Sequence, residues 1–119
     1  MNWTVIFHDD FEPEYYVLPS EVQDALILEA KFLEMFGPSL GRPQVDTLNA
    51  SKHSNMKELR FKVLGGVWRV AFAFDPKRKA ILLVAGNKGG KDQKRFYKQL
   101  IQKADSRFDQ HLRTLEKEV

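Results

Sequence analysis

The stretch KELRFKVLGGVWRVAFAFDPKRKAILLVAG, residues 57–86, decides the fold class of this sequence. It contains three runs rich in apolar, β-branched and aromatic residues, separated by the turn signals Gly65-Gly66 and Asp75-Pro76. A Gly-Gly pair between such runs is typical of a tight hairpin, and Asp-Pro suits the start of a type I turn. The stretch therefore predicts three consecutive antiparallel strands, at 57–63, 67–74 and 79–86.

A further strand and a helix are predicted before this stretch. Residues 2–8 alternate between two faces, which is the pattern of a strand. Ser20, with Gln23 three residues later, predicts a helix that begins with a capping box, and Gly37-Pro38 ends it. The apolar residues of this helix are expected to face the core; they are Val22, Ala25, Leu26, Leu28, Ala30, Leu33, Met35 and Phe36.

The remaining segments complete a single predicted domain, 1–119. The segment from 9 to 19 is interpreted as a turn-like connection, and residues 37–55 as a loop with at most a turn of helix near 45–48. A last helix is predicted from Lys91 to about Leu115, because apolar residues recur at helical spacing there. The order predicts an α+β sandwich with a mostly antiparallel sheet and the helix at 20–36 packed on one face.

Composition excludes several kinds of site. The chain has no cysteine, which excludes disulfides and thiolate chemistry, and its three histidines lack metal-site spacing. We therefore expect no metal and no cofactor. No segment has the character of a signal peptide or a membrane span, so a soluble cytoplasmic protein is expected.

Charge is strongly segregated along the chain. Residues 1–36 carry eight acidic and one basic residue, a net of −7, whereas residues 37–119 carry eighteen basic and eight acidic residues, a net of +10. Such segregation favours a basic surface that binds a polyanion, with the acidic surface elsewhere. Uneven charge also occurs in small domains that bind no nucleic acid, so this feature alone leaves the partner open.

One face of the predicted hairpin gathers basic side chains. If Leu64 lies opposite Val67, then Lys62 and Arg69 are cross-strand neighbours and Arg60 shares their face. Opposed like charges destabilise a sheet by up to about 1 kcal/mol, so stability does not explain them. Three convergent cations suit a phosphodiester backbone. The alternatives are a solvated face with splayed cations, or a one-residue slip that would disperse the cluster.

The stretch VAGNKGGKDQKRFYKQL, residues 84–100, resembles a phosphate-binding loop but lacks its pattern. The spacing from Gly86 to Gly90 is one residue short of a P-loop, and Asp92 occupies the place of the required hydroxyl residue. The end of the third hairpin strand is instead expected near 67–69, so that Lys88 borders the basic face. From the helix beyond, we expect Arg95, Lys98 and an interleaved aromatic, Tyr97, to bind single-stranded nucleic acid.

These residues suit RNA cleavage in which the 2′-hydroxyl is the nucleophile. Such a reaction needs a proton acceptor, a group that stabilises the charged transition state and a proton donor, and preorganised cations can supply the second function. The candidate proton-transfer residues are Tyr97, Lys88 and, in the loop before the second strand, His53. A half-buried helix aromatic and an exposed loop histidine are the alternative interpretations of Tyr97 and His53.

Nearly the whole chain resembles the RelE/HigB-like toxins of bacterial and phage toxin–antitoxin modules, specifically the phage-derived HigB-like branch. The resemblance rests on LGRPQVDTL, NMKELRFKVLGGVWRVAFAFDP, ILLVAGNKGGKDQKRFYKQLIQKADSRFDQHL and the order of strands. It implies a small ribonuclease-type fold, metal-independent cleavage of messenger RNA on the translating ribosome, and inhibition by an antitoxin that is usually a helix-turn-helix protein.

The resemblance also implies roles for individual residues. The family's arginine after an aromatic residue matches Arg69, its basic residue past the last strand matches Lys88, and its C-terminal aromatic best matches Tyr97, with Phe96 adjacent. Basic residues of the preceding strand match Lys57, Arg60 and Lys62 approximately. Arg69 would stabilise the scissile phosphate, and Lys57, Arg60 and Lys62 would contact RNA. Arg95, Lys98 and His53 are further candidates for RNA contact, named from the residues themselves.

Two other functions remain open from the sequence. The same superfamily contains proteins that poison DNA gyrase without cleaving RNA, and an inactive relative could bind nucleic acid only. The resemblance therefore implies a toxin with an antitoxin, the ribosome and messenger RNA as partners, with these two functions as alternatives.

Overall fold

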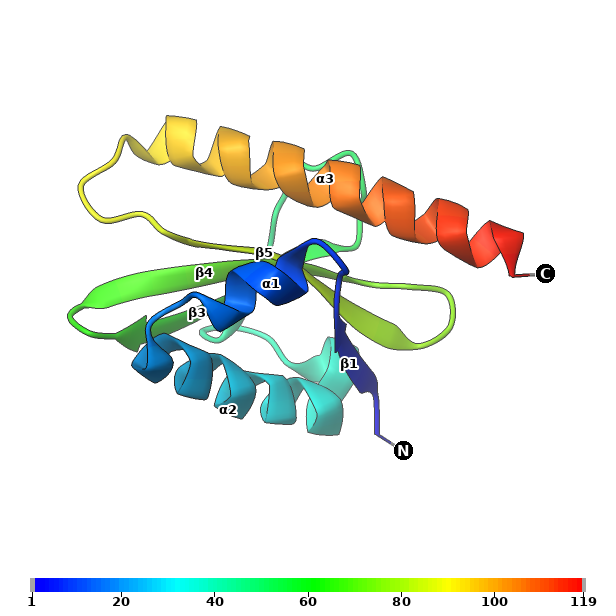
Figure 1. Ribbon diagram of the computed structural model, residues 1–119, viewed down its shortest axis with the longest axis horizontal. Coiled ribbons are helices and arrows are strands. Elements are labelled where there is room, and N and C mark those ends of the chain that lie inside the picture. Colours follow the sequence, from blue (N-terminus) through cyan, green and yellow to red (C-terminus); the bar gives the residue numbers. More distant parts are fainter. Residues whose placement is uncertain (1, 119) are drawn as a thin grey trace.

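A computed structural model of the protein describes residues 2–118. Its elements are β1 (Thr4–Phe7), α1 (Phe11–Tyr16), α2 (Ser20–Phe36), the short 3₁₀ helix η1 (Gly37–Ser39), β2 (Val45–Thr47), β3 (Met56–Val63), β4 (Gly66–Phe74), β5 (Lys79–Asn87) and α3 (Gln93–Lys117). The five strands form one sheet in the order β1-β5-β4-β3-β2, with α2 on one face and α3 on the other (Figure 1). Among the strands of residues 2–118, only β1 and β5 pair in parallel, so the predicted α+β fold with a mostly antiparallel sheet is confirmed.

The β3–β4 hairpin turns through Leu64 and Gly65, whereas the sequence predicted Gly65 and Gly66. Both turn residues have positive φ, 54° and 74°, as a type I′ turn requires. Arg60 therefore lies opposite Arg69, two residues from the predicted register. A leucine with this left-handed backbone conformation costs about 1–2 kcal/mol. The eight residue pairs of the β3–β4 ladder offset this cost. Because a two-residue shift preserves in-out alternation, the predicted faces are retained.

Helix α2 packs on the sheet through one narrow stripe. Its buried residues are Val22, Leu26, Ala30 and Leu33. They pack with the apolar face of the hairpin, including Leu59, Phe61, Val70 and Phe72. Three residues predicted to be core, Leu28, Met35 and Phe36, are instead 55%, 61% and 48% exposed. That prediction is wrong because a helix lying on a sheet contacts it with one side only.

The predicted capping box of α2 is also absent. Pro19 occupies the N-cap position, and no side chain caps the helix. The Gln23 amide instead donates hydrogen bonds to the carbonyl oxygens of Leu18, at 2.8 Å, and Tyr16, at 3.2 Å. Gln23 therefore stabilises the link between α1 and α2, a role that the Ser-x-x-Gln spacing does not distinguish from capping.

Helix α1 replaces the turn-like connection that the sequence predicted. It forms because Phe11 and Tyr15, one helical turn apart, are both buried in the core under the sheet.

Arg107 of α3 holds the same region, since it pairs with both carboxylate oxygens of Glu14 and donates to the carbonyl of Leu83 at 2.7 Å. Its hydrogen bonds lower the pKa of Glu14. Leu83 lies where the β4–β5 register shifts, so this contact satisfies a carbonyl at a bulge.

Strand β2 occupies part of the segment predicted as a loop with at most a helical turn. Val45 and Thr47, both β-branched, pair with Leu59 and Lys57 at the open edge of β3. The prediction of a loop is therefore wrong for Val45–Thr47, because this segment pairs with a sheet edge that the local sequence does not reveal.

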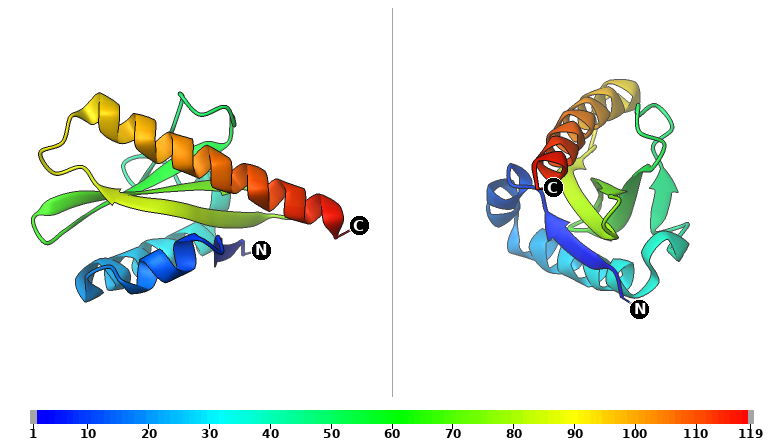
Figure 2. Two further views of the ribbon diagram at one scale, coloured as in Figure 1. Left: turned by 45° about the horizontal axis from the view of Figure 1, so that its top comes forward. Right: turned by 90° about the vertical axis from the view of Figure 1, so that its right-hand side faces the viewer.

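Helix α3 covers the second face of the sheet, as the two views in Figure 2 show. Its buried residues are Phe96, Leu100, Ile101, Ala104 and Phe108, which follow the predicted stripe. They pack with β-strand residues that include Ala71, Ala73, Ile81 and Leu83. Within residues 2–118, no helix combines the length and apolar character that crossing a membrane requires.

Candidate active site

Arg69, Tyr97 and Glu58 form a polar network between the sheet and the N-terminal half of α3. Nε of Arg69 donates to the Tyr97 hydroxyl at 2.5 Å, and this hydroxyl donates to Oε1 of Glu58 at 2.9 Å. The Arg69 Nε and Glu58 Oε1 atoms lie 3.9 Å apart. Arg69 and Glu58 are 9% and 5% exposed. The network is therefore largely shielded from water. In this environment its electrostatic interactions are stronger than they would be in water.

Strand alternation and a small neighbouring residue bring these groups together. Glu58 and Arg69 both point to the α3 side of the sheet, from β3 and β4, and Ala71 lies directly opposite Glu58. Ala71 leaves room for the Tyr97 side chain, which descends from the first turns of α3. The Asp92 carboxylate accepts from the Arg95 backbone N–H at 3.1 Å, and so fixes where this helix begins.

Burial shifts the proton affinities of two members of the network. Burial raises the pKa of Glu58, and the hydrogen bond from Tyr97 and the charges of Arg60 and Arg69 oppose that shift. Burial also raises the pKa of Tyr97, with the Glu58 carboxylate as the next cause. Tyr97 is therefore a neutral phenol at neutral pH, and Glu58 holds its proton more firmly than an exposed glutamate does. Perturbed acids beside an arginine are frequent at catalytic sites.

Gly86 shapes the same region from β5. It lies opposite Arg69 in the ladder, and an added Cβ would stand 2.9 Å from Cε1 of Phe96. The Phe96 ring lies 5.8 Å from the Arg69 guanidinium carbon. The glycine thus allows a buried aromatic ring to approach the backbone beside the network.

We predict that Gly86→Ala destabilises the protein by about 1–3 kcal/mol, the usual cost of overpacking. The reason is that the buried Phe96 ring must move to admit the methyl group. Gly90→Ala is the matched control, because a Cβ there meets nothing within 4 Å. Thermal unfolding of both variants checks this, and equal melting temperatures would contradict it.

The basic residues of the hairpin share the face of Arg69 but do not all adjoin it. Arg60 is its direct cross-strand partner, whereas Lys62 lies opposite Val67. The predicted pairing of Lys62 with Arg69 is therefore wrong, because the turn residues differ from the predicted ones. Arg60 and Lys62 instead line a separate pocket of about 310 Å³, which Arg42 also lines.

Lys88 follows the end of β5, where the sequence placed it. Asn87 pairs with Trp68, so the end of β5 does lie beside 67–69. The Lys88 side chain is half-buried and makes no hydrogen bond or ion pair within residues 2–118. Its position leaves the amine available at the end of the sheet.

Two predicted RNA-binding residues lie apart from the network. Lys57 precedes Glu58 in β3, so its side chain lies on the opposite face of the sheet. Its amine donates to the Thr47 hydroxyl at 3.3 Å. His53 contacts Asp109 at 2.8 Å. Tyr97 and Asp109 are twelve positions apart on one helix, which is about 18 Å along its axis. The structure therefore joins neither Lys57 nor His53 to Arg69.

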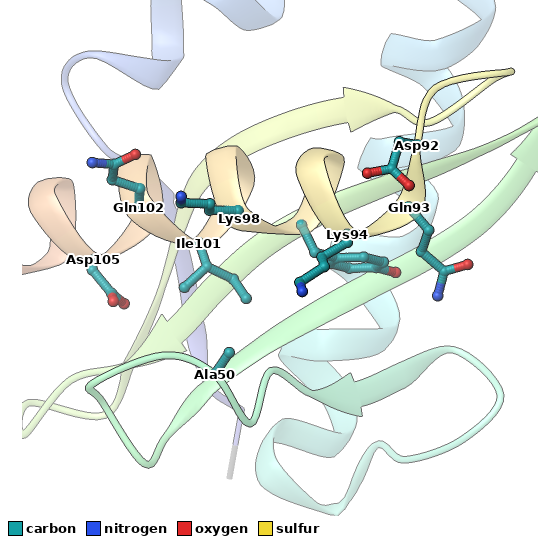
Figure 3. A pocket seen from close by; sticks show the side chains of 9 residues that line it. Ala50, Asp92, Gln93, Lys94, Lys98, Ile101, Gln102 and Asp105 are labelled. Carbon is teal, nitrogen blue, oxygen red and sulfur yellow. The ribbon is translucent and has the colours of Figure 1, made fainter.

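A larger pocket of about 890 Å³ opens on the other side of Tyr97. Figure 3 shows it between α3 and the loop that carries Ala50. Lys98 lines it, and Lys94 lies one turn earlier. Arg95 is exposed on α3 but does not line this pocket.

Glu58 is the member of the network that the sequence analysis did not identify. The signal was present, because the alternation that places Arg60 and Lys62 on one face places Glu58 there too. Within residues 2–118, no three His, Asp or Glu side chains converge as metal ligands would.

Comparisons with known proteins give one family, two relatives and one fold. The family model described as phage-derived protein Gp49-like matches residues 14–109. Two Mycobacterium tuberculosis proteins, whose names describe them as candidate toxins HigB2 and HigB3, are 44% and 43% identical over 100 and 108 residues. These matches cover 83% and 91% of this chain. The chain spans 49% of the length of HigB2 and 92% of that of HigB3.

A solved structure shares the fold. The free-state structure of an arginine-to-alanine double mutant of the E. coli toxin RelE superposes with a TM-score of 0.62. The match covers 90% of this chain and 98% of that one, at 13% sequence identity. At that identity the likeness concerns the fold alone, and it confirms the RelE-like fold that the sequence predicted.

Proposed function

Because this chain belongs to the phage-derived Gp49-like family, we propose that it is the toxin of a toxin–antitoxin module and that it cleaves messenger RNA on the ribosome. The observation that carries the proposal is the Arg69–Tyr97–Glu58 network beside basic side chains. The HigB names of two relatives support the toxin role. The expected partners are a cognate antitoxin, the ribosome and messenger RNA.

In the proposed reaction, the 2′-oxygen of RNA attacks the adjacent phosphorus atom and the 5′-oxygen leaves. Arg69 stabilises the negative charge that develops on the phosphate oxygens. Its Nε is held by Tyr97 and its Nη1 donates to the Val67 carbonyl at 3.3 Å, while Nη2 has no hydrogen-bond partner within residues 2–118. The guanidinium is thus oriented by the protein and keeps N–H groups for the phosphate.

Proton transfer to the protein is assigned to Tyr97 and Glu58. Tyr97 is a phenol, so it acts as a relay: its oxygen accepts the 2′-hydroxyl proton while its own proton passes to the Glu58 carboxylate. Glu58 is suited to receive the proton because burial raises its pKa. Lys88, at the end of β5, is the group that we assign to protonating the leaving 5′-oxygen.

The proposal predicts immediate arrest of protein synthesis when the protein is produced in bacterial cells. Incorporation of a radiolabelled amino acid, measured within minutes of induction, checks this. Continued protein synthesis with filamentous cells and an induced DNA-damage response would instead support gyrase poisoning. Continued synthesis in healthy cells would support an inactive relative.

A further inference from the structure

The pocket beside Tyr97 has an apolar floor that runs away from the proposed chemistry. Tyr97 and Ile101 form this floor on α3. Figure 3 shows Ile101 pointing toward Ala50 of the loop. Tyr97 hydrogen-bonds to the polar network through its hydroxyl, and its side chain also forms part of the pocket wall. The volume of about 890 Å³ falls within the range of pockets that hold whole small ligands.

The acidic groups of this pocket are already bound to the protein. Asp105 accepts hydrogen bonds from the Ser51 hydroxyl and, at 3.2 Å, from the Lys52 backbone N–H. These contacts hold the loop against α3, and so build the second wall. Asp92 is the helix cap that accepts from the Arg95 N–H. Neither carboxylate is therefore the group that this pocket offers to a ligand.

The groups left unengaged are two amides and two cations. Gln93, Gln102, Lys94 and Lys98 line the pocket, are exposed, and make no side-chain hydrogen bond or ion pair within the described part of the chain. An aromatic and aliphatic floor suits the face of a nucleobase. Amides can donate to and accept from its edge, and ammonium groups pair with phosphates.

We propose that this pocket binds a nucleotide next to the scissile phosphate and that Gln102 selects its base. The base stacks on Tyr97 and Ile101, and Lys94 and Lys98 hold the phosphates that flank it. This proposal rests on the proposed function for its RNA substrate and adds the site where sequence preference arises. Tyr97 separates the pocket from Arg69, so the same residue adjoins both base and phosphate.

Two variants test the pocket in cleavage. Ala50→Trp fills it from an exposed loop position, and Asn49→Trp, at the adjacent exposed position outside the lining, is the matched control. We expect Ala50→Trp to reduce cleavage at least tenfold and Asn49→Trp to leave it unchanged. Gln102→Ala should lower the preference for one base beside the cuts about tenfold. Gln99→Ala, three residues earlier on α3, changes a residue that lines a neighbouring pocket and not this one, and should not change that preference.

A binding measurement separates this inference from the proposed function. In an Arg69→Ala background, the affinity for a labelled single-stranded hexaribonucleotide of mixed sequence should fall about tenfold with Ala50→Trp and stay constant with Asn49→Trp. The pocket proposal would be overturned if Ala50→Trp and Asn49→Trp bound the hexaribonucleotide with equal affinity and, where cleavage occurs, showed equal cleavage and equal base preference. If Ala50→Trp lowered the affinity but the protein cleaved no message, the pocket proposal would stand and the nuclease proposal would be overturned.

Discussion

Arg69→Ala is expected to abolish growth inhibition and to lower messenger RNA cleavage by at least about 10²–10³-fold, the usual loss when a transition-state charge stabiliser is removed. Arg69 is the one cation that is both buried and oriented by the Tyr97 hydroxyl within the described chain. Growth of induced cells and mapped cleavage products measure the effect. Arg113→Ala, an exposed arginine near the end of α3, is the control and should remain fully toxic.

The fold is expected to survive the loss of Arg69. Truncation leaves Tyr97 bonded to Glu58, so no polar group of the network loses its last partner. The purified variant should unfold cooperatively and still bind its antitoxin. A folded Arg69→Ala protein that remains fully toxic would show that the site is assigned to the wrong residue.

Glu58→Gln is expected to lower cleavage about 10²-fold or more while stabilising the protein at neutral pH. The amide oxygen can still accept from the Tyr97 hydroxyl, but it cannot receive a proton as the proposed relay requires. Opposite effects on activity and stability are the mark of a group retained for function. Cleavage assays and thermal unfolding on the same preparations measure the two effects.

The pH dependence of this difference follows from the raised pKa of Glu58. A carboxyl whose folded pKa exceeds its unfolded value favours folding fully below the unfolded pKa, about 4.3, and loses that contribution as pH rises through the folded pKa. Wild type should therefore lose stability relative to Glu58→Gln from about pH 4 upward. A wild type that is more stable than the variant at pH 8 would contradict this account.

The fold was largely predictable because its strands are marked by local patterns. The Asp-Pro turn and the alternation of β3 and β4 identified the strands and the faces of Leu59 and Arg60 correctly. Prediction failed where a distant partner decides the conformation. Val45 becomes a strand residue because β3 has an open edge, and Phe11 becomes helical because it enters the core.

The candidate site was predictable in part, for the same physical reason. Strand phase places Arg69 on the basic face of the hairpin, and Tyr97 lies in the helix expected beyond the strand that ends beside that face. The hydrogen bond between Arg69 and Tyr97 is seen in the structure. Glu58 was overlooked because acidic strand residues are ordinarily solvated, and only the docked helix shows that this one is buried. The partners of Lys57 and His53 depend on side-chain contacts that spacing does not encode.

The central claim is that this protein cleaves messages as they are translated. Brief induction in bacterial cells, followed by mapping of new 5′ ends on several abundant messages, tests it most directly. We predict new ends inside translated regions, their loss when the start codon of a reporter message is removed, and their absence with Arg69→Ala. Intact messages in cells whose growth has stopped would contradict the claim and indicate a different target.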